Sequence, residues 1–171
     1  MKPGELMFAT GIGTLVLAAA MAFTVFSAHG LAAVTNYVGL DVRSRGALDW
    51  MSQEIRQADA VTVCDSTRLA LVGKEPGSGA GYTLTYTYSP TLKTLTRTKG
   101  TDSQTMLTQC DSLNWHMYQR NMTKGTDQPI PTSDVNQCKL IKLAWVCSRN
   151  ILGKSANTES VQSSEIVIRK K

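Results

Sequence analysis

The sequence predicts an α+β fold in which one long N-terminal helix, apolar in its first half and amphipathic in its second, packs on an antiparallel β-sheet. Two observations support this prediction. No formally charged residue lies between Glu5 and Asp41, and beyond about residue 60 apolar and polar residues alternate with a period of two. At 171 residues, the chain has room for one helical anchor and one soluble domain of about 110 residues. We therefore divide it into a membrane-spanning part of the helix over 1–30, an amphipathic part over 31–60 and a globular domain over 61–171.

The first segment, from Leu6 to Ala28, is almost continuously apolar. It is long enough to cross a bilayer, which takes about 20 residues. A secretory signal peptide has a shorter apolar core of about 7 to 15 residues with basic residues before it. Here the run is longer, the acid Glu5 precedes it, and apolar residues continue as far as Leu40. The segment favours a membrane-spanning helix over a signal peptide.

The next segment keeps a helical period but carries apolar residues on one face only. Spacings of three, four or seven separate the residues of this stripe, which are Leu40, Ala47, Leu48, Met51, Ile55 and Ala58. A single helix over residues 5–59 would be roughly 80 Å long. We expect its second half to lay this stripe on the globular domain.

The globular part begins to read as strands after about residue 60. Tyrosines and leucines alternate with threonines over 82–88, the chain turns at Ser89 and Pro90, and a second alternating run follows over 94–97, which predicts a hairpin. Further strands are predicted at 68–72, 113–119, 139–147 and 165–169. The polar segments 74–81 and 121–137 are predicted loops, which either face a partner or are variable and solvated.

The charge of the chain is mildly basic, with 18 Lys and Arg against 13 Asp and Glu, and the whole excess of five lies beyond residue 40. This level permits weak contact with DNA or anionic surfaces. Only Arg169, Lys170 and Lys171 form a basic cluster. We interpret that cluster as a solvated C-terminal tail.

The four cysteines, which are Cys64, Cys110, Cys138 and Cys147, all lie outside the apolar segment, an even number that suits an oxidising compartment. None forms a Cys-x-x-Cys motif, which argues against a zinc ribbon or a thioredoxin-type site. Cys64 and Cys110 flank predicted elements and each precedes Asp-Ser, so we expect a disulfide between them. Cys138 and Cys147 flank a strand that holds them about 30 Å apart, too far for a disulfide unless the segment bends.

Catalytic signals are sparse in the sequence. His29 and His116 are its two histidines, and neither has a second ligand at metal-binding spacing. The glycines at 77–81 lack the lysine and hydroxyl residue of a phosphate-binding loop. We predict that the protein is not an enzyme and that it has no cofactor and no metal site.

One stretch resembles a known family. GELMFATGIGTLVLAAAMAFTVF is similar to the N-terminus of the type IV pilin and type II secretion pseudopilin superfamily, in which a mature chain carries glutamate at its fifth position before a long apolar helix. The resemblance implies that a prepilin peptidase has removed a leader and that Met1 is the N-methylated N-terminus. It also implies an assembly role for Met1 and Glu5, in which the glutamate pairs with the N-terminal amine of a neighbouring subunit.

The resemblance continues past the anchor, with two departures. The hairpin, the strands near residues 113–119 and 139–147 and the basic C-terminal end resemble the larger minor pilins of the W or J type. Residues 2–4 differ from the usual pilin pattern, and Ala22 stands where many members have proline. Any loosening of the helix would therefore depend on Gly11 and Gly13.

Three functions follow as expectations. The first is a structural subunit of a type IV pilus-like filament, made of copies of this chain or mixed with other pilins, which passes from the inner membrane to the cell surface. The second is a minor pseudopilin of a type II secretion system. The third, from another class, is a membrane-anchored binding protein that does not polymerise. This third function leaves Glu5 and the long apolar helix unexplained.

Overall fold

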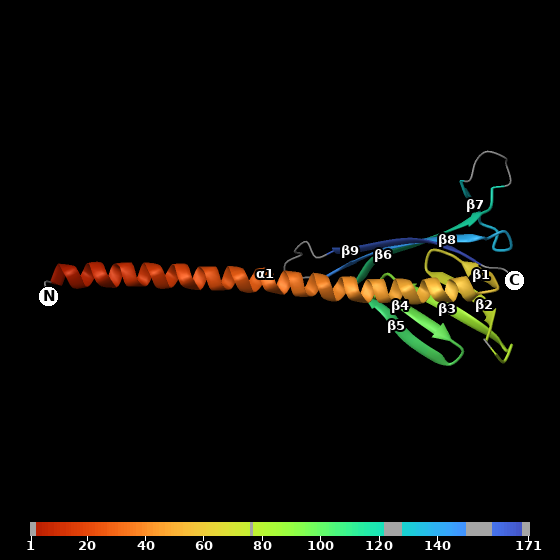
Figure 1. Ribbon diagram of the computed structural model, residues 1–171, viewed down its shortest axis with the longest axis horizontal. Coiled ribbons are helices and arrows are strands. Elements are labelled where there is room, and N and C mark those ends of the chain that lie inside the picture. The colour runs from red at the N-terminus through yellow and green to blue at the C-terminus, as the bar shows by residue number, and fades with distance from the viewer. Residues whose placement is uncertain (1–2, 76, 122–127, 150–158, 169–171) are drawn as a thin grey trace.

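The computed structural model of the chain describes residues 3–75, 77–121, 128–149 and 159–168. One helix, α1 (Pro3–Gln57), runs the length of the molecule, and its second half is covered by antiparallel sheets (Figure 1). The predicted α+β fold is confirmed. Met1 lies outside the described residues, so its predicted methylation stays a prediction.

Helix α1 runs without a break from Pro3 to Gln57, and its threonine hydroxyls find partners within the helix. Pro3 stands in the first turn, where its missing N–H costs nothing. The hydroxyls of Thr10, Thr14, Thr24 and Thr35 each donate a hydrogen bond to a carbonyl one turn earlier, at 2.9 to 3.0 Å for three of them and 2.8 Å for Thr24. Such a hydroxyl leaves no unsatisfied donor on an apolar helix surface. At the other end, Ala58 N–H donates to the Glu54 carbonyl and closes the last turn.

The globular part contains two antiparallel sheets. The first is a five-stranded meander of β1 (Ala60–Cys64), β2 (Arg68–Lys74), β3 (Gly81–Ser89), β4 (Thr94–Lys99) and β5 (Asp102–Thr108), in that order. The second has the order β7-β6-β8-β9 and is made of β6 (Cys110–Gln119), β7 (Ile130–Pro131), β8 (Leu140–Ser148) and β9 (Glu159–Val167). The chain passes from one sheet to the other between Thr108 and Cys110.

Most predicted strands are present, but some are longer than predicted and three were missed. The predicted hairpin is the β3–β4 pair, in which Tyr86 faces Arg97. Strand β9 begins at Glu159 rather than at 165. The prediction missed β1, β5 and β7; β7 lies in the segment predicted as the loop 121–137, of which 122–127 fall outside the described residues.

The core lies where α1 meets both sheets. Figure 1 shows strands β2 to β5 on one side of the domain end of α1 and strands β6 to β9 on the other. Most of the predicted apolar stripe is buried there, and the buried residues of α1 are Leu40, Ser44, Ala47, Met51 and Ile55. The sheets contribute fully buried side chains such as Leu84, Leu143 and Trp145. The first half of α1 adds nothing to this core.

Candidate assembly helix and its anchor in the domain

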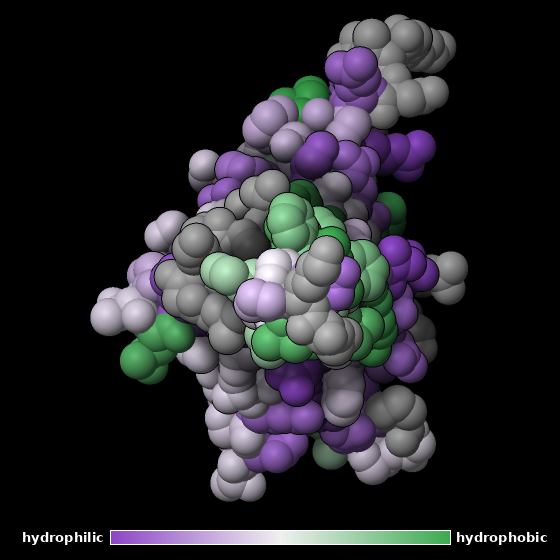
Figure 2. All heavy atoms as spheres, turned by 90° about the vertical axis from the view of Figure 1, so that its left-hand side faces the viewer, coloured by the Kyte–Doolittle hydropathy of each residue, from purple (hydrophilic) through white to green (hydrophobic). Residues whose placement is uncertain are grey.

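The first half of α1 is an apolar surface that none of the described residues covers. Every described residue from Pro3 to Leu31 is exposed, including Phe8, Phe23 and Phe26. By length and composition α1 can cross a membrane, and none of its most apolar stretch is buried. Figure 2 looks along the helix from this end and shows its hydrophobic side chains in front of a more hydrophilic domain surface. We call residues 3–31 the free half of α1.

The free half carries glycines that this chain does not need for packing. A Cβ added at Gly11, Gly13 or Gly30 would meet nothing within 4 Å. Glycine inside a helix costs about 1 kcal/mol relative to alanine. Small residues allow a neighbouring helix to approach closely. The room above these glycines is therefore available to another helix.

Glu5 lies in the first turn of α1, at the end farthest from the domain, and its side chain is exposed (Figure 1). A carboxylate is favourable near a helix N-terminus, where backbone N–H groups point outward. Its predicted partner is the N-terminal amine of a second subunit. The structure holds one chain, so this pairing stays a prediction.

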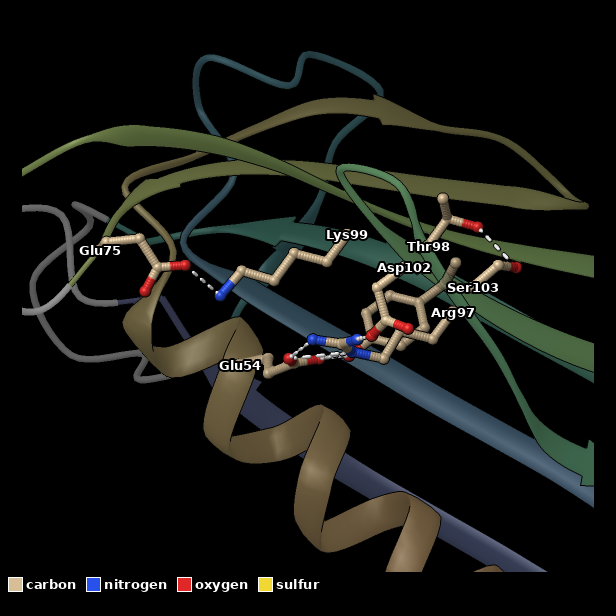
Figure 3. A network of polar contacts seen from close by, with 8 residues as sticks. Glu54, Glu75, Arg97, Thr98, Lys99, Asp102 and Ser103 are labelled. Carbon is tan, nitrogen blue, oxygen red and sulfur yellow. Dashed lines mark hydrogen bonds and ion pairs between the residues drawn. The ribbon is translucent and has the colours of Figure 1, made fainter.

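The second half of α1 is anchored to the five-stranded sheet by a buried ion pair. Arg97 Nε on β4 lies 3.0 Å from both carboxylate oxygens of Glu54, and Nη2 lies 2.5 Å from Oε1. The Tyr86 hydroxyl donates a hydrogen bond to the same carboxylate. The Arg97 guanidinium also lies over the Trp50 ring, 5.5 Å from its centroid. Figure 3 shows Glu54 reaching from the helix to Arg97.

The pKa shifts of Glu54 and Tyr86 follow from their burial and from the hydrogen bonds among Glu54, Arg97 and Tyr86. Burial by itself would raise the pKa of Glu54, but hydrogen bonds from Arg97 and Tyr86 outweigh it and hold that pKa below its ordinary value. Burial and the bond to Glu54 raise the pKa of the Tyr86 hydroxyl. Glu54 is therefore an ionised partner of Arg97 at neutral pH. The sequence analysis missed this anchor, although Arg97 shares the inward face of β4 with Leu95.

Weaker polar contacts surround the anchor and the place where α1 leaves the domain. Near the anchor, Lys99 Nζ lies 2.5 Å from Glu75 Oε1 at a half-exposed site, as Figure 3 shows. At the opposite end of the domain, Arg149 Nη1 donates to Asn36 Oδ1 at 3.2 Å, and Gln162 Nε2 donates to Asp41 Oδ1 at 3.1 Å. Contacts at both ends thus fix the direction in which the free half projects.

The cysteines are not arranged as predicted. The structure contains no Cys64–Cys110 disulfide: Cys64 ends β1, whereas Cys110 opens β6 and lies opposite Cys147 on β8. No disulfide joins any of the four cysteines in the structure, and β5, which the prediction missed, carries the chain from the first sheet to the second before Cys110. Burial, with the nearby Cys138 and Asp65, raises the pKa of the Cys64 thiol to about 11. Contact with the Cys147 sulfur and burial raise the pKa of Cys110, and the same contact lowers the pKa of Cys147.

The histidines do not meet in one site. His29 is exposed on the free half, and His116 lies on β6 beside a groove of about 550 Å³ whose lining includes Asp65 and Thr132. No three His, Cys, Asp or Glu side chains within the described ranges are placed to hold a metal ion. The candidate site is therefore the exposed apolar surface of the free half of α1.

No protein-family model, curated protein or solved structure matches the chain. What the structure itself shows is a long N-terminal helix, apolar enough to anchor in a membrane, with its second half packed on antiparallel sheets. The interpretation of its function therefore depends on the geometry of this helix.

Proposed function

We propose that this protein is a structural subunit of a type IV pilus-like extracellular filament, assembled through the free half of α1. The observation that carries the proposal is that this half is apolar, fully exposed and directed away from the domain. Exposed apolar area of this size is unfavourable in water at about 25 cal/mol per Å². Lipid covers it before assembly, and the helices of other subunits cover it in the filament.

The length of the apolar surface favours the filament over a simple anchor. The charge-free residues 6–40 span about 50 Å as a helix, whereas the hydrocarbon core of a bilayer is about 30 Å thick. Beyond one membrane thickness, Leu31, Val34 and Val38 are still 70%, 61% and 52% exposed. In a single-pass anchor, no described part of this chain and no lipid would cover these side chains. In a helical bundle, the helices of neighbouring subunits cover these side chains.

Glu5 has a defined role in this proposal. Its carboxylate pairs with the N-terminal amine of an adjacent subunit as the helices come together. An acid and an amine each cost several kcal/mol to bury alone, and together they offset that cost. A subunit out of axial register would leave both groups without a partner. Glu5 therefore selects the register of assembly rather than supplying most of the binding energy.

Two other functions use parts of the same structure. A minor pseudopilin of a type II secretion system would use the same helix and Glu5, in a short filament built with other subunits. A membrane-anchored binding protein that does not polymerise would use only the anchor. The filament proposal places the precursor in the inner membrane, where a prepilin peptidase acts on it, and the assembled subunit at the cell surface.

Electron microscopy of sheared surface fractions tests the proposal with a matched pair of variants. Glu5→Ala removes the carboxylate of the free half, and Asp49→Ala removes an exposed carboxylate from the part of the same helix beside the domain. We expect Glu5→Ala to abolish filaments while the monomer stays in the membrane fraction, and Asp49→Ala to leave them unchanged.

The results separate the three functions. Filaments that persist in Glu5→Ala would contradict the assembly role and favour the binding protein. Loss of filaments in Glu5→Ala but not in Asp49→Ala supports the assembly role of Glu5. Long surface filaments in the unmutated strain then indicate a pilus, whereas short filaments confined to the envelope indicate a secretion pseudopilus.

A further inference from the structure

Two cysteines face each other across the four-stranded sheet. Cys110 on β6 is the register partner of Cys147 on β8, in an antiparallel pair. The N–H of Ser148, which follows Cys147, donates to the carbonyl of Gln109, which precedes Cys110, at 3.1 Å. The Cys110 N–H is bound elsewhere, to the Lys93 carbonyl. Hydrogen-bonded and non-hydrogen-bonded pairs alternate along such a ladder. Cys110 and Cys147 therefore occupy a non-hydrogen-bonded pair, next to an irregularity that shifts the register between Cys110 and Ser112.

This position has the geometry that a disulfide requires. In a regular non-hydrogen-bonded pair the Cα atoms are about 4.5 Å apart. A disulfide requires a Cα–Cα distance of about 4.4 to 6.8 Å. Directly opposed residues of an antiparallel pair point to the same face of the sheet. Both side chains are almost completely buried on that face, at 0% and 1% exposure. The two buried side chains thus lie on the same face of the sheet at directly opposed positions.

The residues around Cys110 and Cys147 show which parts of the fold a disulfide between them would connect. The Cys110 carbonyl accepts a hydrogen bond from the Tyr88 hydroxyl of the five-stranded sheet at 3.1 Å. Gln109, in the left-handed region with φ of 61°, forms the crossing between the sheets. On the other side, the buried Ser44 of α1 lies near the Cys147 thiol. The pair therefore lies where the two sheets and the helix meet.

We propose that Cys110 and Cys147 form a disulfide in the mature protein and that it locks β6 to β8 beneath α1. The oxidant is a protein disulfide of the thiol-oxidase class. One cysteine thiolate attacks that disulfide and gives a mixed disulfide, and the second thiolate displaces the oxidant's sulfur. Two protons and two electrons leave the cysteine pair, and the oxidant is released as a dithiol. Because both cysteines are almost completely buried in the folded protein, the exchange takes place before the core closes.

The arrangement of trypsin sites makes this bond directly observable. Each cysteine falls in a different tryptic peptide: 57–68 holds Cys64, 100–120 holds Cys110, 125–139 holds Cys138 and 143–149 holds Cys147. The full chain is exported to an oxidising compartment, treated with N-ethylmaleimide under denaturing conditions and digested without reductant. We expect mass spectrometry to find 100–120 linked to 143–149. A link from 100–120 to 57–68 or 125–139, or maleimide on Cys110 and Cys147, would overturn the proposal.

Two variants add a stability readout that does not depend on filament assembly. Cys147→Ser opens the 38-residue loop between the partners, and we expect it to lower the Tm of the detergent-solubilised chain by roughly 10 °C. Cys64→Ser is the matched control and should keep the 100–120 to 143–149 link. If Cys147→Ser does not fold, the peptide map of the unmutated chain still shows whether the Cys110–Cys147 disulfide forms. Equal Tm values for the unmutated chain with and without reductant during unfolding would contradict a stabilising bond.

Discussion

The two halves of α1 share one backbone and differ in what surrounds them. In the half that contacts the domain, a buried residue recurs every three or four positions from Leu40 to Ile55, so the sheets of this chain account for its pattern. In the free half, no described side chain is buried, and the helix is apolar on all faces. We therefore attribute the all-round apolar pattern of the free half to contacts with lipid or with other subunits.

The difference also separates stability from assembly. Substitutions in the half beside the domain should act on the unfolding of the domain, because that half lies in the core. Substitutions in the free half should leave unfolding unchanged and act on insertion or association. Each prediction below compares a change in one region with a matched change elsewhere, beginning with the largest expected effect.

Removal of Arg97 should have the largest effect. Arg97→Ala leaves the Glu54 carboxylate buried without its cation, which typically costs about 3–5 kcal/mol. Glu75→Ala is the control, because it breaks the more exposed pair with Lys99 and should cost less than about 1 kcal/mol. Chemical unfolding of the detergent-solubilised chain, followed by tryptophan fluorescence, measures both.

The same pair gives the prediction a dependence on pH. The pKa of Glu54 in the folded protein lies below its value of about 4.3 in the unfolded chain, so its ionisation stabilises the fold above that pH. This contribution is lost as the pH falls through the lowered folded pKa. The stability gap between the unmutated chain and Arg97→Ala should therefore narrow on acidification below about pH 4.3. A gap that stays constant would show that Arg97 acts by packing alone.

The second prediction compares two methionines of the same helix. Met51 is 0% exposed and Met21 is 69% exposed. Met51→Ala should destabilise the domain by about 2–5 kcal/mol, because it removes core contacts and leaves a cavity. Met21→Ala should not change the unfolding midpoint. Equal losses in the two variants would mean that the free half folds back on the domain and would remove the contrast between the halves.

Much of this organisation could be predicted from the sequence, because it depends on local periodicity. The charge-free run, the stripe from Leu40 to Ala58 and the hairpin at 82–97 each repeat a pattern over several residues. Strand β5 (Asp102–Thr108) was missed because exposed polar residues occupy its first positions, so that its alternation is weak. The split into two sheets could not be predicted either, since it depends on strand pairing between distant segments.

The errors at the candidate sites have the same origin. The Cys110–Cys147 register follows from the β6–β8 pairing, which joins residues 37 apart in sequence. The Glu54–Arg97 pair joins the helix to β4 across 43 residues. Neither has a local signature. By contrast, the proposed role of Glu5 comes from one continuous stretch, where sequence patterns are most informative.

The third prediction has the smallest effect on folding and tests the contrast between the halves most directly. A Cβ added at Gly46, in the half beside the domain, or at Gly13, in the free half, meets nothing within 4 Å. Alanine favours a helix over glycine by about 1 kcal/mol, so Gly46→Ala should raise the Tm by about 2–4 °C. Gly13→Ala should leave the Tm of the domain unchanged.

The filament readout should show the opposite order. A methyl group at Gly13 occupies the room in which a neighbouring helix would approach, so Gly13→Ala should yield fewer filaments, or filaments that shear more easily, in electron micrographs. Gly46→Ala should leave filament number unchanged. If Gly13→Ala assembles as well as the unmutated chain, the free half packs through its larger side chains. Its glycines would then be tolerated residues in a helix that contacts lipid or neighbours elsewhere on its surface.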